Sequence, residues 1–285
     1  MTEPTQPPRN WPGLVRERGL ARRGTAPTTF SAVTPEPHTP AGPTPGIDVS
    51  NWQGTVDWAA VRASGVRFGI CKASESVDFA DPYFPGNWAN MLANDVVRGG
   101  YHFCRPDENP PQVEAAYFLR CINAAGGLLP GDLLIGDFEA GTGNLLTWAN
   151  TWLDAVAQSV GFLPVFYSGW WFMQPHNLHS DDHLAQHGLW LAEYDTTPPV
   201  EPPNWPVVAL WQFTCTGTVP GVQGDCDMNL FNGSIDQLRR YGLQSGASGP
   251  APPTLQNHDI VQTERYLLAE PPDVAGAIQY LKQFS

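Results

Sequence analysis

Residues 133–141 read LLIGDFEAG, an apolar run that ends in two acids separated by one aromatic residue. Pro130 and Gly131 precede the run, and a short apolar stretch after such turn residues is typical of a strand covered on both faces. Side chains two residues apart on a strand point to the same face, so we expect Asp137 and Glu139 to lie side by side. Two interpretations remain open here: a paired carboxylate site, or a helix cap beside a solvated loop acid.

Composition limits the classes of partner. The chain has 285 residues and is 42% hydrophobic, which is enough for one large domain or two small ones. Its formal net charge of -13 argues against nucleic acid or an anionic membrane as a partner. We expect no membrane insertion and no signal peptide, because no apolar stretch is long enough for either. If the protein acts outside a cell, we expect another route to take it there.

The cysteines do not indicate a metal site. Five are present, at positions 71, 104, 121, 215 and 226, and none shows the CxxC or Cys/His spacing of a zinc site. We therefore predict no metal, and nothing in the sequence suggests a cofactor. Cys215 and Cys226 flank a Gly-rich turn and are placed to bridge two strand ends, but five cysteines suit a reduced protein equally well.

The chain divides at changes in composition. Residues 1–45 form a Pro- and Thr-rich N-terminal extension that has too few apolar residues for a core of its own. Residues 46–243 form the main domain, and the sequence QSGASGPAPP at 244–253 is a linker. Residues 254–285 contain a short helical pattern and are too few to fold independently. We expect the function to lie in the main domain.

Strand-like and helix-like segments alternate in residues 46–243. The expected strands are 45–50, 66–74, 99–105, 133–140, 163–168, 189–194, 207–213 and 226–231. The expected helices, which lie between the earlier strands, are 55–65, 88–97, 109–127 and 144–161. The last three strands are joined by short connections with little room for helices. The pattern predicts an α/β fold, a TIM-like β/α barrel whose final part lacks its helical layer.

Each expected strand ends in a polar side chain. In a β/α barrel the chemistry lies at the carboxyl ends of the strands. The residues at these ends are Asp48, Glu75, His102, Asp137 with Glu139, Tyr167, Glu193, Gln212 and Asp227. So many polar groups on one rim favour a paired carboxylate site at residues 133–141 over a helix cap beside a solvated loop acid.

Aromatic residues are interleaved with these polar groups. Aromatic rings offer flat apolar platforms, and carboxylates and amides bind hydroxyl groups, so the mixture suits a carbohydrate ligand. The aromatic residues near the strand ends are Trp52, Tyr101, Phe103, Trp170, Trp171, Trp190, Tyr194 and Trp211. About half of them are expected to fill the barrel or its outer layer instead. We predict that Glu75, Tyr101, His102, Phe103, Tyr167, Trp190, Glu193, Tyr194 and Gln212 contact the substrate.

An ordered set of motifs resembles glycoside hydrolase family 25, the Chalaropsis-type lysozymes. The motifs are GIDVSNWQG (46–54), FGICKASES (68–76), GYHF (100–103), GDFE (136–139), VFYSG (165–169), LWLAEY (189–194), WQF (211–213) and DMN (227–229). The resemblance covers residues 46–242 or so. It implies a (β/α)5β3 barrel and an N,O-diacetylmuramidase, which cleaves the β-1,4 bond between N-acetylmuramic acid and N-acetylglucosamine in peptidoglycan.

The resemblance also implies roles for single residues. Glu139 of the D-x-E pattern matches the general acid/base, and Asp137 matches its helper. Asp48 and Asp227 match two further family acids, and Tyr101 and Tyr167 match tyrosines near the sugar ring. The sequence departs from the family pattern twice: Ser76 stands where a glycine is usual, and Phe138 replaces the more common aliphatic residue. Neither departure removes a catalytic group.

Crowding of four acids is expected to raise at least one pKa, and we predict that Glu139 keeps a proton near neutral pH. Inverting, retaining and substrate-assisted routes all stay open at this point, and we favour the last, with Asp137 orienting the 2-acetamido group. Two other functions compete: a non-catalytic peptidoglycan-binding barrel and a chitinase-like hydrolase.

The expected partner is the glycan strand of peptidoglycan, which the chain meets at the bacterial cell wall. Several members of the family come from bacteriophages. A phage product released by a holin, or carried as part of a virion, fits these expectations, and so does a bacterial enzyme. The terminal extensions are candidates for attachment to a cell wall or a virion.

Overall fold

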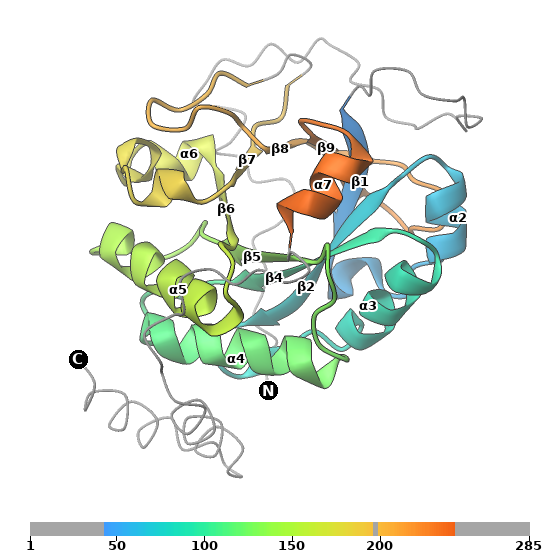
Figure 1. Ribbon diagram of the computed structural model, residues 1–285, viewed down its shortest axis with the longest axis horizontal. Coiled ribbons are helices and arrows are strands. Elements are labelled where there is room, and N and C mark those ends of the chain that lie inside the picture. The colour runs from blue at the N-terminus through green and yellow to red at the C-terminus, as the bar shows by residue number, and fades with distance from the viewer. Residues whose placement is uncertain (1–42, 196–198, 243–285) are drawn as a thin grey trace.

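Eight strands close into a barrel in the computed structural model, which describes residues 43–195 and 199–242 (Figure 1). Their order around the ring is β1, β9, β8, β7, β6, β5, β4 and β2, and pairing of β1 with β2 closes it. The barrel strands are β1 (Thr44–Val49), β2 (Phe68–Glu75), β4 (Val97–Phe103), β5 (Leu133–Asp137), β6 (Val165–Gly169), β7 (Leu189–Ala192), β8 (Leu210–Gly217) and β9 (Cys226–Phe231). The short strand β3 (Phe79–Ala80) only extends β2. The predicted barrel is confirmed.

One barrel strand runs against the others. The strands from β1 through β8 pair in parallel around the ring, whereas β9 is antiparallel to both β8 and β1. The expectation that each strand brings its carboxyl end to the same rim is therefore wrong for the last one. Asp227, the second residue of β9, reaches that rim from the beginning of its strand.

Helices cover the first part of the ring only. The helices are α2 (Trp58–Ala63), α3 (Phe84–Ala93), α4 (Pro111–Ala124), α5 (Leu145–Val160), α6 (Trp170–Met173) and α7 (Ile235–Tyr241). Helix α3 lies about four residues earlier than the predicted 88–97, because Pro85 is placed in its first turn and Asp95, at φ +54°, turns the chain into β4. Within the described residues, β7, β8 and β9 follow one another without an α-helix between them.

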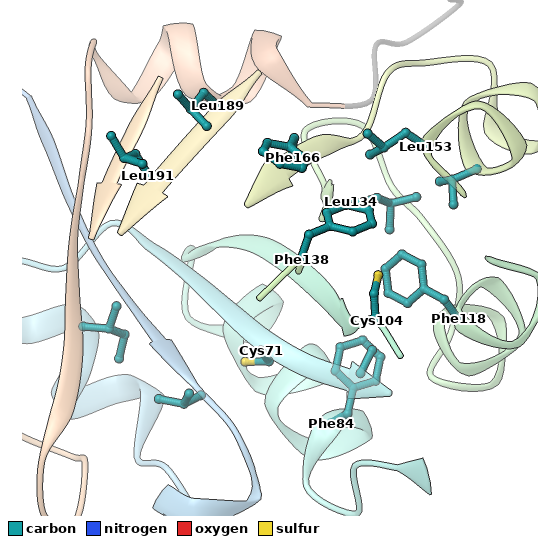
Figure 2. Close-up of a cluster of buried hydrophobic side chains, with 14 of the residues drawn as sticks. Cys71, Phe84, Cys104, Phe118, Leu134, Phe138, Leu153, Phe166, Leu189 and Leu191 are labelled. Atoms are coloured by element: carbon teal, nitrogen blue, oxygen red, sulfur yellow. The ribbon is translucent and has the colours of Figure 1, made fainter. Parts of the chain in front are cut away.

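The apolar core has two layers. The inner layer fills the barrel and includes Ile70, Leu133, Ile135 and Trp190. The outer layer lies between the strands and the helices, where Figure 2 shows Phe138 and Phe166 beside Leu134 and Leu153. Alternating strand residues supply the two layers, because successive side chains point to opposite faces. The position of a residue in this alternation therefore decides whether its side chain points into the barrel or toward the helices.

Helix α7 closes the end of the barrel from which β5 and β7 start. Leu238 is completely buried in the inner layer, and the Tyr241 ring lies 5.6 Å from that of Phe231. A Cβ atom placed on Gly188, just before β7, would fall 1.7 Å from the Tyr241 hydroxyl, so helix and barrel are in close contact there. The opposite end of the barrel carries the polar residues predicted for the site.

The predicted segments agree with these bounds only in part. Strand β1 begins at Thr44, two residues before the expected domain start at 46. Apart from residues 43–45, the expected extension 1–45 lies outside the described residues, as do the linker 244–253 and the segment 254–285. No described helix is long and apolar enough to cross a membrane. All five cysteines are thiols, so Cys215 and Cys226 are not bridged.

Gly136 of the GDFE motif gives a test of the packing between the layers. A Cβ atom at Gly136 would lie 2.6 Å from the Phe138 ring and 2.7 Å from that of Trp152. We predict that Gly136→Ala lowers the free energy of unfolding by about 1–3 kcal/mol, because two buried rings must shift. Gly86 in α3 is the control, since an added Cβ meets nothing within 4 Å. Gly86→Ala should raise the free energy of unfolding by up to about 1 kcal/mol, because alanine has a higher helix propensity than glycine. Equal effects in urea unfolding would contradict this description of the packing.

Candidate active site

Asp137 and Glu139, the two acids of residues 133–141, lie at the carboxyl end of β5. The strand ends at Asp137, earlier than the predicted residue 140. Asp137 alternates with Leu133 and Ile135 and so points to the barrel interior, where it is 5% exposed. Phe138 points outward, as expected, and its ring stacks on Phe166 at 5.2 Å (Figure 2). Glu139 follows beyond the strand and is partly exposed.

Hydrogen bonds fix the backbone between the acids. The Phe138 amide donates to the Tyr167 carbonyl at 2.9 Å, and the Ser168 hydroxyl donates to the Phe138 carbonyl at 2.5 Å. The Phe138 ring also meets Trp152 edge to face at 5.8 Å. Two backbone hydrogen bonds and one ring contact thus hold Phe138 in place. The backbone that carries Asp137 and Glu139 is fixed with it, and so is the spacing of the two carboxyl groups.

Asp48 and Asp227 face each other across two antiparallel strands. They are directly paired in the register of β1 and β9, so their side chains leave the sheet on the same face. Like charges in such a pair destabilise a sheet. Asp48 Oδ2 accepts hydrogen bonds from Gln212 Nε2 at 2.8 Å and Asn229 Nδ2 at 2.7 Å, which compensates part of the cost. A costly arrangement supported in this way is expected at a functional site.

A network of amides and aromatic residues surrounds Asp48. Gln212 accepts hydrogen bonds on Oε1 from the hydroxyls of Tyr167 and Tyr194, each at 3.1 Å. Trp190 Nε1 donates to Asn229 Oδ1 at 2.8 Å. Two amide side chains thus connect three aromatic residues of β6, β7 and the segment after β7 to one carboxylate.

Two cations, Lys72 and Arg105, lie close enough to Glu139 to affect its pKa. The Lys72 ammonium, 1% exposed at its side chain, forms an ion pair with Glu75 inside the barrel wall. Arg105 Nε donates to the same carboxylate at 2.8 Å, and its guanidinium lies over the Phe103 ring at 4.5 Å. Both oxygens of Glu75 are occupied by these cations. Glu75 therefore holds Lys72 and Arg105 in place.

Burial and charge change the protonation of the acid pair. Burial, followed by the nearby Asp48 carboxylate, raises the pKa of Glu139 to about 7, although Lys72 and Arg105 oppose the shift. Burial and then the charge of Glu139 raise the pKa of Asp137 well above its usual range. Close to neutral pH the pair therefore retains a proton, which a general acid requires. Asp137 Oδ1 is buried and makes no hydrogen bond within the described residues.

The tyrosines remain protonated beside these acids. Burial is the main cause that raises the pKa of Tyr101, Tyr167 and Tyr194 well above the usual value, and negative charges add to it. Tyr101 and Phe103 belong to the inner layer and are 8% and 3% exposed. Each tyrosine hydroxyl is thus a hydrogen-bond donor at the end of the barrel.

One predicted substrate contact does not reach this group. His102 is fully buried in the outer layer, where Nδ1 lies 2.9 Å from Ser74 Oγ and Nε2 lies 3.0 Å from Glu114 Oε2. Both ring nitrogens are used, so the structure does not bring His102 to the site. Glu193 follows β7, and its backbone carbonyl accepts from Trp211 Nε1 at 2.6 Å. Its contact with the substrate stays a prediction.

Ser76 explains one departure from the family pattern. Its φ is +50°, in the left-handed region that glycine enters without strain and other residues enter at a cost. Its hydroxyl donates to Glu108 Oε2 at 3.1 Å and accepts from Asn109 Nδ2 at 2.8 Å. These bonds hold the turn after Glu75 in the conformation that a glycine adopts more easily.

Three residues of this arrangement were not predicted as site residues: Lys72, Arg105 and Asn229. A lysine inside an otherwise apolar strand at 66–74 was a usable signal, because lysine is almost never fully buried without a partner. Asn229 stands in the DMN motif, which was a second signal. Arg105 carried no comparable signal, since its partner Glu75 comes from another strand and becomes visible only in the closed ring.

Comparisons with known proteins agree with the site. Residues 47–222 match the model for glycosyl hydrolases family 25. Lysozyme M1 of Streptomyces globisporus is 32% identical over 68% of this chain and 69% of its own length. An N,O-diacetylmuramidase of Arthroderma benhamiae is 30% identical over 74% of this chain and 92% of its own.

A solved structure, the bacterial lysozyme from Streptomyces coelicolor, superposes with a TM-score of 0.65 at 29% identity. It covers 71% of this chain and 97% of the lysozyme. The family match includes three of the four acids, Asp48, Asp137 and Glu139, and ends shortly before Asp227. Sequence, fold and site lead to one classification: this chain belongs to glycoside hydrolase family 25.

Proposed function

We propose that the chain is a peptidoglycan muramidase that cleaves the β-1,4 bond between N-acetylmuramic acid and N-acetylglucosamine, with Glu139 as the general acid. The observation that carries the assignment is the acid pair itself. A carboxyl group with a pKa of about 7 lies two residues from a buried carboxylate oxygen that has no hydrogen-bond partner in the part of the chain that the structure describes. The names of the lysozyme and muramidase relatives support the substrate class.

Glu139 suits the leaving-group side of the reaction. It lies beyond the end of β5 and is partly exposed, so a sugar on the rim can reach its proton. Donation of this proton to the glycosidic oxygen lets the bond to the anomeric carbon break. Because the protonated form is required, the activity should fall as the pH rises through the Glu139 pKa of about 7.

Asp137 suits the 2-acetamido group of the substrate. Its Oδ1 atom has no hydrogen-bond partner among the described residues, and an acetamido N–H would supply one. Such a hydrogen bond favours the charged form of Asp137 and so leaves the shared proton on Glu139. The acetamido oxygen then forms a bond to the anomeric carbon as the leaving oxygen takes the proton, and water later opens this intermediate and returns a proton to Glu139.

The remaining acids and cations balance the charge of this reaction. Asp48 and Asp227 place negative charge near the positive charge that develops on the sugar ring, which stabilises the transition state. Lys72 and Arg105 lower the pKa of Glu139 against the effect of burial and so keep the group able to release its proton. We assign the contacts with the sugar to the hydroxyls of Tyr101, Tyr167 and Tyr194, the Gln212 amide and the Trp190 and Phe103 rings.

A non-catalytic wall-binding barrel and a chitinase-like hydrolase are the competing functions. A barrel that only binds would have no use for a carboxyl group held protonated near pH 7. Family membership favours peptidoglycan over chitin. Release of reducing ends from peptidoglycan and from chitin separates the three functions in one assay.

We predict that Glu139→Gln lowers the rate of peptidoglycan hydrolysis by about 10²–10⁴-fold with the fold retained, because the proton donor is lost. Asp137→Asn should also slow hydrolysis strongly, since a neutral amide replaces the charged carboxylate that accepts from the acetamido N–H and stabilises the positive charge of the intermediate. The control is Asp236→Asn, which removes an acidic side chain that is 73% exposed on α7 at the other end of the barrel. Hydrolysis by Glu139→Gln at the wild-type rate would contradict the assignment.

The biological setting is a separate proposal: the enzyme lyses bacterial walls for a bacteriophage, and the terminal extensions attach it to the wall or to a virion. The site residues named above lie between Asp48 and Asn229, outside both terminal extensions. Mass spectrometry of purified virions tests the virion-borne form. We expect stoichiometric peptides from this chain, and their absence from intact particles would contradict a virion-borne role.

A further inference from the structure

Two histidines and an aspartate form a cluster away from the acids. Asp154 lies on α5, whereas His183 and His187 flank the short 3-10 helix η3 (Leu184–Gln186) in the connection from β6 to β7. Each residue offers one ligand atom, and the three atoms lie within 4.8 Å of one another. The cluster thus joins a helix to a segment that follows it by more than twenty residues.

His187 is already oriented as a metal ligand would be. Its Nδ1 atom lies 2.9 Å from the Pro164 carbonyl oxygen, which can only accept, so the proton is on Nδ1. Nε2 is then the nitrogen with a lone pair. A histidine that binds a metal commonly donates its other ring N–H to a backbone carbonyl, because this bond fixes both the tautomer and the ring. His187 is 2% exposed, so its ring is also held by packing.

The other two groups are accessible from solvent. His183 Nε2 lies 2.9 Å from Asp154 Oδ1, and the two side chains are 44% and 43% exposed. The backbone under His183 is fixed by Asp181, whose Oδ1 accepts from the amides of His183 at 3.1 Å and Leu184 at 2.9 Å. The site therefore combines one rigid ligand with two that an arriving ion can rearrange.

We propose that Asp154, His183 and His187 bind one divalent transition-metal ion of the zinc class. Two imidazoles and a carboxylate suit such an ion, whereas Ca²⁺ and Mg²⁺ prefer sites made of oxygen ligands alone. Bonds of about 2.0–2.2 Å place tetrahedral ligand atoms roughly 3.3–3.6 Å apart, so small changes in the exposed side chains complete the geometry. Solvent fills the fourth position.

The proposal concerns stability and not the hydrolysis of peptidoglycan. The ion would tie the connection between β6 and β7 to α5, in the part of the barrel where α6 has only four residues. Binding of a ligand to the folded state alone stabilises that state. A ligand-bridged connection would thus strengthen the barrel where its helical layer is thin.

A second group of potential ligands, His102, Cys104 and Glu114, is a weaker candidate. All three residues are buried, and both His102 nitrogens already have partners in Ser74 and Glu114. A metal there would have to displace these contacts and would have no path from solvent. The test below distinguishes the two groups because it changes only Asp154 and His183.

The test is titration of Zn²⁺ into the untagged full-length chain by calorimetry, with Co²⁺ absorption as a report on geometry. The variants are Asp154→Asn and His183→Ala, both at partly exposed positions on different elements. The control is His176→Ala, which removes a histidine of the same connection that contacts the Phe172 carbonyl and lies outside the cluster. Circular dichroism checks that each variant folds.

We expect the wild type and His176→Ala to bind one Zn²⁺ per chain with the same affinity and to melt at a higher temperature with Zn²⁺ than without it. Asp154→Asn and His183→Ala should bind at least about tenfold more weakly, because each loses a ligand. Equal binding by all four proteins would overturn the proposal, and so would a wild type that binds no Zn²⁺.

Discussion

The crowding of carboxyl groups at one end of the barrel is the constraint on which the site depends. Asp48 and Asp227 are cross-strand neighbours, and the Asp137 and Glu139 pair faces them with pKa values raised by burial and by these charges. Repulsion of this kind costs stability, and the barrel offsets it with the Gln212 and Asn229 amides and with the buried Lys72. The same repulsion keeps a proton on the acid pair, so the cost in stability is also the source of the chemistry.

The outer layer fixes the positions of these acids. Phe138 sends its ring between Phe166 and Trp152, and Gly136 leaves the space that those rings need. Asp137 at the end of β5 and Glu139 just beyond it are thereby held on either side of a buried aromatic anchor. Sites built on rigid elements hold catalytic groups more closely than loops do. The aromatic residue in GDFE thus serves the site without touching the substrate.

Much of the fold and the acid pair could be predicted from the sequence, because apolar strands that end in acids follow a clear alternation. The direction of β9 was missed although a signal existed: the connection from Gly217 to Cys226 is short, and a parallel pair needs a crossover of about a dozen residues. His102 was misplaced for a similar reason. Its neighbours Tyr101 and Phe103 point into the barrel, so alternation sends His102 outward. The bonds of Gln212 and Asn229 to Asp48 were not predictable, since they join residues far apart in sequence.

The protonation of Glu139 is the central claim, and carbon NMR of its carboxyl group measures it directly. The titration of Glu139 in the free enzyme should have its midpoint near pH 7, because burial and the Asp48 charge disfavour the carboxylate. In Asp48→Asn the midpoint should move to lower pH, since the largest of the charges that raise the pKa of Glu139 is removed. A Glu139 that titrates near its ordinary value of 4.5 in the wild type would contradict the account.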